Sequence, residues 1–194
     1  AHLGIPSGNY HVVIKVDNRH HVHESNEHDN ECYFHSPKVT IGGYGSSTCA
    51  CTNYSGNFCD DFDSYNTGYI TPQSVCWTTS SGAQRTHRDA KVQSQFGNKY
   101  LGIHGGENTI LRLGNRTSGK YELEFDVFLR TGKRGNYNIL HTFTPNSTQA
   151  DDEVGAEIYF NGDGTGFVRA ANIPWSFTYE MDKWVTIKHV FDFT

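Results

Sequence analysis

The sequence predicts an all-β protein built around a two-sheet antiparallel sandwich. Segments with strand-like alternation recur along its 194 residues, and no window keeps the 3.6-residue apolar period of an amphipathic helix. The chain is rich in turn-forming glycine, with 20 residues, and in aromatic residues that suit pleated surfaces, with 12 Phe and 11 Tyr. Repeated strands separated by turn signals are typical of sandwiches and barrels.

The clearest strand signal lies at residues 121–129. The odd-numbered residues there are all apolar, and Glu122, Glu124 and Asp126 occupy even positions, so one face should meet a core and the other water. Residues 161–164, Asn-Gly-Asp-Gly, form a hairpin signal because these residue types tolerate a positive φ. Further strands are expected at residues 100–103, 109–113, 137–143, 154–160, 166–170 and 184–193.

The first 59 residues are interpreted as two parts that lie outside the sandwich. Residues 9–17 alternate in strand fashion, with residues 20–25 and 38–41 as further strands. Because two or three strands do not fold stably alone, residues 1–34 are assigned to the C-terminal strands of a preceding β domain. Residues 35–59 are then a Cys/Gly-rich linker, and residues 60–194 the sandwich, which we expect to be truncated at its C-terminus because Thr194 directly follows a strand.

The five cysteines all lie in one part of the chain, at Cys32, Cys49, Cys51, Cys59 and Cys76. This clustering favours disulfides that stabilise a poorly cored junction. The zinc alternative lacks the paired C-x-x-C spacing of structural sites. The odd number leaves one thiol free or paired with another chain. The pairing stays open, and disulfides indicate an extracellular or cell-surface location.

Charge and hydropathy exclude two classes of partner. The net charge of -5 comes without basic blocks, so the electrostatic footprint of nucleic-acid binding is missing. No stretch approaches the length of apolar sequence that a membrane span requires.

Two stretches resemble known families. Gly8-Asn9-Tyr10, Asp17, Glu24-Ser25-Asn26-Glu27 and Asn30 resemble the last hairpin of a CARDB-type immunoglobulin-like domain. The sandwich part resembles the concanavalin A/laminin-G-like module of secreted multidomain proteins of Bacteroidetes. That second resemblance rests on the following stretches: Asp60-Asp61-Phe62-Asp63-Ser64-Tyr65, Gly68, Pro72-Gln73-Ser74, Trp77, residues 113–123, Tyr159-Phe160-Asn161, residues 162–166, and Asp182-Lys183-Trp184. It implies a jelly-roll of two antiparallel sheets outside the cell, but no particular ligand.

The acidic positions 122, 124 and 126 are the strongest indication of an enzyme. Retaining glycosidases need two carboxyl groups about 5–5.5 Å apart, and laminarinase-like enzymes of the same fold carry E-x-D-x-E or E-x-D-x-x-E on a strand. Here the order is E-x-E-x-D, so the middle and last residues depart from the pattern. A solvated or ligand-facing strand is preferred to a glycoside hydrolase, and no catalytic residue is expected.

Aromatic residues are the candidate ligand contacts. Trp175 in a loop before the last strand, Tyr179 and Trp77 are candidates for stacking on a sugar ring, and Asn138 is a candidate polar contact. Trp77 and Trp184 are also candidates for packing between the sheets. Asp60, Asp61 and Asp63 are candidate ligands of a structural Ca²⁺, which related sandwich modules often hold.

The sequence therefore favours a secreted or cell-surface module that binds without catalysis, with carbohydrate as the expected ligand. The alternative is a structural segment of an extracellular fibre or surface assembly. The expected partners are a glycan or a surface protein, together with self-association through strand addition or the odd cysteine.

Overall fold

The computed structural model describes residues 11–15, 31–41, 58–82, 89–113, 118–145, 154–170 and 173–193. Every regular element in these ranges is a β-strand, which confirms the predicted all-β class. Within the same ranges there is no helix with the length and apolarity needed to cross a membrane.

The strands form two antiparallel sheets. Sheet A has the order β13 (Ile173–Thr178), β12 (Thr165–Ala170), β11 (Val154–Phe160), β10 (Gly135–Leu140), β1 (His11–Lys15), β8 (Asn108–Arg112) and β5 (Trp77–Thr78). Sheet B has the order β14 (Trp184–Asp192), β9 (Lys120–Leu129), β2 (Glu31–Ile41), β7 (Asn98–His104), β6 (Lys91–Gln95) and β4 (Gly68–Tyr69), and β3 (Phe58–Cys59) pairs with β2.

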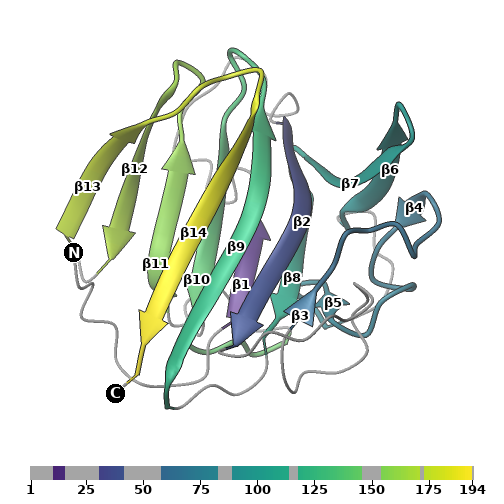
Figure 1. The fold of residues 1–194 in the computed structure, drawn as a ribbon, viewed down its shortest axis with the longest axis horizontal. Helices are drawn as coiled ribbons and strands as arrows, with labels where there is room; N and C mark the ends of the chain where they lie inside the picture. Colours follow the sequence, from purple (N-terminus) through teal and green to yellow (C-terminus); the bar gives the residue numbers. More distant parts are fainter. Residues whose placement is uncertain are drawn as a thin grey trace.

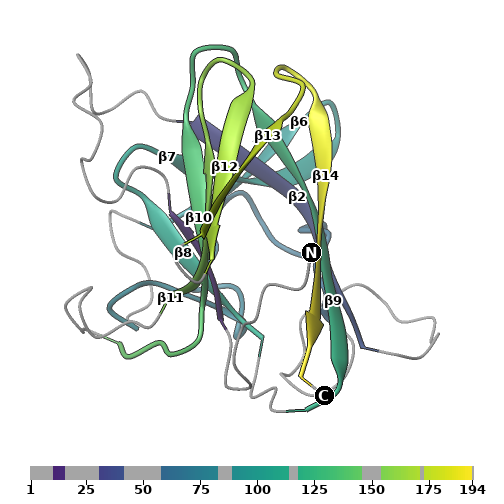
Figure 2. The same cartoon turned by 90° about the vertical axis from the view of Figure 1, so that its left-hand side faces the viewer.

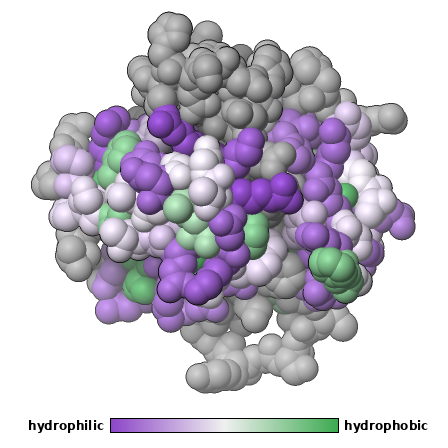
Figure 3. Space-filling view, turned by 90° about the horizontal axis from the view of Figure 1, so that it is seen from above, coloured by the Kyte–Doolittle hydropathy of each residue, from purple (hydrophilic) through white to green (hydrophobic). Residues whose placement is uncertain are grey.

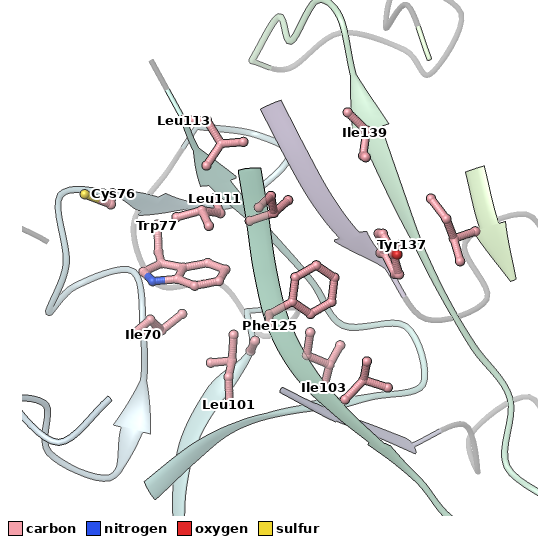
Figure 4. Packing of buried hydrophobic residues seen from close by; sticks show 14 of the residues in the cluster. Ile70, Cys76, Trp77, Leu101, Ile103, Leu111, Leu113, Phe125, Tyr137 and Ile139 are labelled. Atoms are coloured by element: carbon pink, nitrogen blue, oxygen red, sulfur yellow. The ribbon is translucent and has the colours of Figure 1, made fainter. Parts of the chain in front are cut away.

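The two sheets lie face to face and form a sandwich. Figure 1 shows sheet B in front of sheet A, and Figure 2 shows the two layers from the side. The core between them is apolar, and Phe125 and Tyr137 contact each other across it with ring centroids 5.2 Å apart (Figure 4). Both rings are buried, with 3% and 0% of their surface exposed. Interdigitation of two inner faces in this way is typical of a β-sandwich.

The N-terminal strands belong to these same sheets, which corrects the predicted division at residues 34 and 59. β1 pairs with β10 on one side and with β8 on the other. β2 pairs with both β9 and β7, and β3 adds to β2. The segments assigned to a separate immunoglobulin-like end and a linker therefore supply interior strands of the sandwich. The local pattern missed this because each partner strand lies far away in the sequence.

Strand positions in the sandwich follow the predicted alternation closely. Along β9, Leu123, Phe125 and Val127 are buried while the residues between them are half-buried. The hairpin at residues 161–164 is present, with Gly164 at φ +83° and a hydrogen bond from Asn161 N to Thr165 O of 2.8 Å. Residues 20–25, predicted as a strand, lie outside the described ranges.

One predicted loop is a strand. Residues 173–178 form β13, the last strand of sheet A, in register with β12. Proline, present here as Pro174, has no backbone N–H to donate, and it is tolerated on an edge strand, where one side of the backbone has no partner strand.

A hydrogen bond across the core links the two sheets. The hydroxyl of Tyr137 on β10 lies 2.5 Å from Nε2 of His189 on β14. The ring of His189 is also surrounded by Phe125 and Phe191. This apolar surrounding disfavours the imidazolium and lowers the pKa of His189 to about 4. The imidazole is therefore neutral at physiological pH and is hydrogen-bonded through Nε2 to the hydroxyl of Tyr137.

The lowered pKa of His189 predicts that acid destabilises the fold. The pKa of His189 in the folded protein, about 4, lies below the ordinary value of 6.5. The contribution of the neutral imidazole to the free energy of unfolding is therefore fully present above pH 6.5 and is lost as the pH falls toward 4. The free energy of unfolding should drop by about 1.4 kcal/mol for each pH unit in that window. Urea unfolding of the wild type and of His189→Gln as a function of pH measures this. An equal decline in both proteins would contradict the assignment.

Candidate functional site

The candidate site is the outer face of sheet B, where Trp184 is exposed. Val185, the next residue of β14, faces the core side, and Trp184 lies directly opposite Phe128 of β9. Trp184 therefore points away from the core, with 46% of its surface exposed. Its predicted packing between the sheets is wrong. Figure 3, the view from above, shows mainly hydrophilic side chains with small apolar spots.

A short anchored turn fixes the position of Trp184. Asp182 has a positive φ of 59°, and its carboxylate accepts hydrogen bonds from Thr131 N (3.0 Å) and Thr131 Oγ1 (2.6 Å). The N–H of Asp182 in turn donates to Leu129 O at 2.8 Å. These hydrogen bonds lower the pKa of Asp182 and hold the beginning of β14 against the end of β9.

Three aromatic rings meet on this face. The ring of Trp184 lies 5.4 Å from Phe128 and 6.4 Å from Tyr100, between ring centroids. β14 and β7 are separated by β9 and β2, a span of three strand spacings of about 4.8 Å each. The side chains of Trp184 and Tyr100 therefore lean toward each other across the outer face of the sheet. We call these three residues the aromatic cluster.

Polar groups border the aromatic cluster on the β6–β7 side. Gln93, which is in register with Tyr100, places its Nε2 3.0 Å from Nε2 of His104. The amide of Gln93 lies over Gly102, where an added Cβ would come within 2.8 Å of it. Only glycine leaves room for this arrangement, and nothing in the sequence pattern singled out Gly102 or Gln93.

On the other side, the predicted acidic positions line β9. Lys188 of β14 forms an ion pair of 2.6 Å with Glu122, which raises the pKa of Lys188. Asp126 accepts a hydrogen bond of 2.6 Å from Thr186. Glu124 lies directly opposite Lys188 in the register. Cross-strand pairing of this kind is a common arrangement for a polar sheet face.

Trp77 is a core residue rather than a ligand contact, which corrects its assignment. Only 2% of its surface is exposed. Its indole Nε1 donates to Asp60 Oδ2 at 2.9 Å, and Tyr65 donates to the same oxygen at 2.8 Å. Asp60 Oδ1 accepts the N–H of Phe62 at 3.1 Å. Desolvation raises the pKa of Asp60, and the three donors satisfy its buried carboxylate.

The predicted calcium ligands do not converge. Asp60 is fully buried and used by its core partners, Asp61 accepts the N–H of Asp63 at 3.1 Å, and Asp63 is exposed. Among the described residues no three His, Cys, Asp or Glu side chains form a group suited to a metal ion.

The remaining predicted contacts are dispersed. Trp175 is 36% exposed on β13, at the edge of the other sheet. Tyr179 is half-buried, contacts Phe160 and donates to the carbonyl of Asn161. Asn138 is 7% exposed on β10, and its Oδ1 has no hydrogen-bond partner within the described part of the chain. The structure therefore brings none of these three to the aromatic cluster.

Two of the five cysteines can be described in full. Cys59 and Cys76 are both disulfide-bonded, as expected from their clustering. Cys76 is fully buried at the margin of the core (Figure 4). The side chains of Cys32, Cys49 and Cys51 lie outside the described residues.

No protein-family model, no curated protein and no solved structure matches this chain.

Two substitutions test the placement of Trp77 in the core and of Trp184 on the surface. Trp77→Phe removes the indole donor from buried Asp60 and leaves a small cavity, so the free energy of unfolding should fall by about 2–4 kcal/mol. Trp184→Phe changes a surface contact and should cost less than about 1 kcal/mol. Chemical denaturation of both variants beside the wild type measures the difference, and equal losses would contradict the two placements.

Proposed function

We propose that this chain is a secreted or cell-surface module that binds carbohydrate without catalysis, through the outer face of sheet B. The observation that carries the proposal is the aromatic cluster, with Trp184 46% exposed at its rim and Tyr100 and Phe128 beside it. Aromatic faces bind the C–H face of pyranose rings by dispersion and by removing apolar surface from water.

The polar border of the cluster supports the same ligand class. Sugar hydroxyls both donate and accept hydrogen bonds, and the border offers groups of both kinds. Gln93 and His104 lie on the β6–β7 side, and Asp126 with Thr186 lies on the β14 side. A few fixed polar groups around an apolar platform are the usual source of orientation in small-ligand sites.

The acidic positions of β9 support binding rather than hydrolysis. Glu122 is held in an ion pair with Lys188, and Asp126 is hydrogen-bonded to Thr186. Both side chains are thus engaged by partners on the neighbouring strand β14, as is common on a polar sheet face. We therefore assign these residues to the polar border of the binding face.

The cysteines support the proposed compartment. Cys59 and Cys76 are disulfide-bonded, and structural disulfides persist mainly in oxidising compartments outside the cell. This supports the secreted or cell-surface location in the proposal.

A glycan array tests the function. We expect the wild type to bind at least one neutral or amino oligosaccharide class, and Trp184→Ala to weaken that binding by at least about tenfold, because the stacking platform is lost. Val190→Ala is the matched control, since Val190 is 65% exposed on the same face of β14 but outside the aromatic cluster. Binding that survives Trp184→Ala, or no binding to any glycan, would refute the proposal.

A further inference from the structure

The sandwich has an incompletely covered side, where β13 and β14 are the last strands of their sheets. Trp175 lies opposite Val168, and Val168 lies opposite Ile158, so all three share the face that points toward sheet B. Ile158 is 2% exposed, whereas Val168 is half-buried and Trp175 is 36% exposed. Apolar cover on this inner face therefore decreases toward β13.

Sheet A extends further to this side than sheet B does. His189 of β14 is hydrogen-bonded to Tyr137 of β10, so β14 lies over the middle of sheet A. β11, β12 and β13 follow β10 in sheet A, and Figure 1 shows β12 and β13 beyond the edge of β14. No strand of the described part of sheet B is left to cover them.

On one side of β14, the edge strand of sheet B, the backbone N–H and C=O groups have no partner strand among the described strands. Among the described strands, β14 pairs only with β9, so one side of residues 185–190 faces no partner strand. Val185 and Ile187, which point toward the core side, are only half-buried. An edge with unpaired N–H and C=O groups next to incompletely covered apolar side chains is a template for strand addition.

We propose that this side of the sandwich accepts an extended segment of a partner polypeptide, which adds to β14 as a further strand and covers Trp175. One occupant satisfies both features: its backbone completes the β14 ladder, and alternate apolar side chains pack on Val168 and Trp175. The inference stands on the edge of the sandwich and does not depend on the glycan proposal.

Charge specifies the outward residues of that partner strand. The outer faces of β9 and β14 carry four carboxylates and two lysines: Glu122, Glu124, Asp126, Asp192, Lys120 and Lys188. Both lysines are already paired, Lys120 with Asp192 and Lys188 with Glu122. The two carboxylates that form no ion pair with a lysine, Glu124 and Asp126, lie on β9, one strand further from the added strand. They favour long basic side chains at the outward positions of the added strand.

The test uses a labelled synthetic peptide, Lys-Val-Thr-Val-Lys-Val-Thr-Val-Lys, which matches the nine residues of β14 in length. Fluorescence anisotropy measures binding to the full chain, and hydrogen exchange with mass spectrometry locates it. We expect binding with slower exchange of the amides of residues 185–190. Trp175→Glu should weaken binding by at least about tenfold, and so should a peptide with glutamate in place of lysine.

Phe96→Ser is the matched control, because Phe96 is 95% exposed at the turn between β6 and β7, on strands away from β14. Phe96→Ser should leave peptide binding unchanged. A loss of binding equal to that of Trp175→Glu would show that the peptide binds nonspecifically and would overturn the proposal. Absence of binding, or protection of residues 173–178 in place of 185–190, would also overturn it. The glutamate peptide needs no change in the protein, so the charge test holds even if Trp175→Glu does not fold.

Discussion

The first strands of the chain occupy the interior of both sheets, and the rest of the structure depends on them. β1 joins β10 to β8 in sheet A, and β2 joins β9 to β7 in sheet B. Without these strands each sheet would separate into two parts, and the backbone groups of β10, β8, β9, β7 and β3 would lose partners. Buried N–H and C=O groups without partners are costly, so the sandwich needs both strands.

The candidate site also depends on β2. Phe128 lies on β9 and Tyr100 on β7, the two strands that flank β2. Their approach to Trp184 across the sheet therefore requires β2 between them. On the opposite face of the same sheet, Phe125 and His189 contact Tyr137 of sheet A. One sheet thus provides half of the core on its inner face and the proposed binding surface on its outer face, which is the usual division of an antiparallel sheet.

The sequence allowed local features to be predicted but not the pairing of distant segments. The alternation at residues 121–129 identified β9 and its acidic outer face correctly, because a period of two reports which residues face the core. The same alternation at residues 184–193 places Trp184 on the other face of the strand from Val185 and Ile187. The exposure of Trp184 could therefore have been predicted from the sequence. The partners of β1 lie at residues 108–112 and 136–140, and no local pattern encodes such a pairing. The placement of Gln93 over Gly102 likewise depends on strand register.

Residues 11–15 and 31–41 are part of the sandwich, and a shortened chain tests this most directly. A protein of residues 60–194 lacks β1, β2 and β3, so the account predicts no cooperative thermal unfolding and poorly dispersed amide resonances. The full chain should show one cooperative transition and dispersed resonances. Cooperative unfolding of the shortened chain, with dispersed resonances, would show that residues 60–194 form an independent sandwich and would contradict the account.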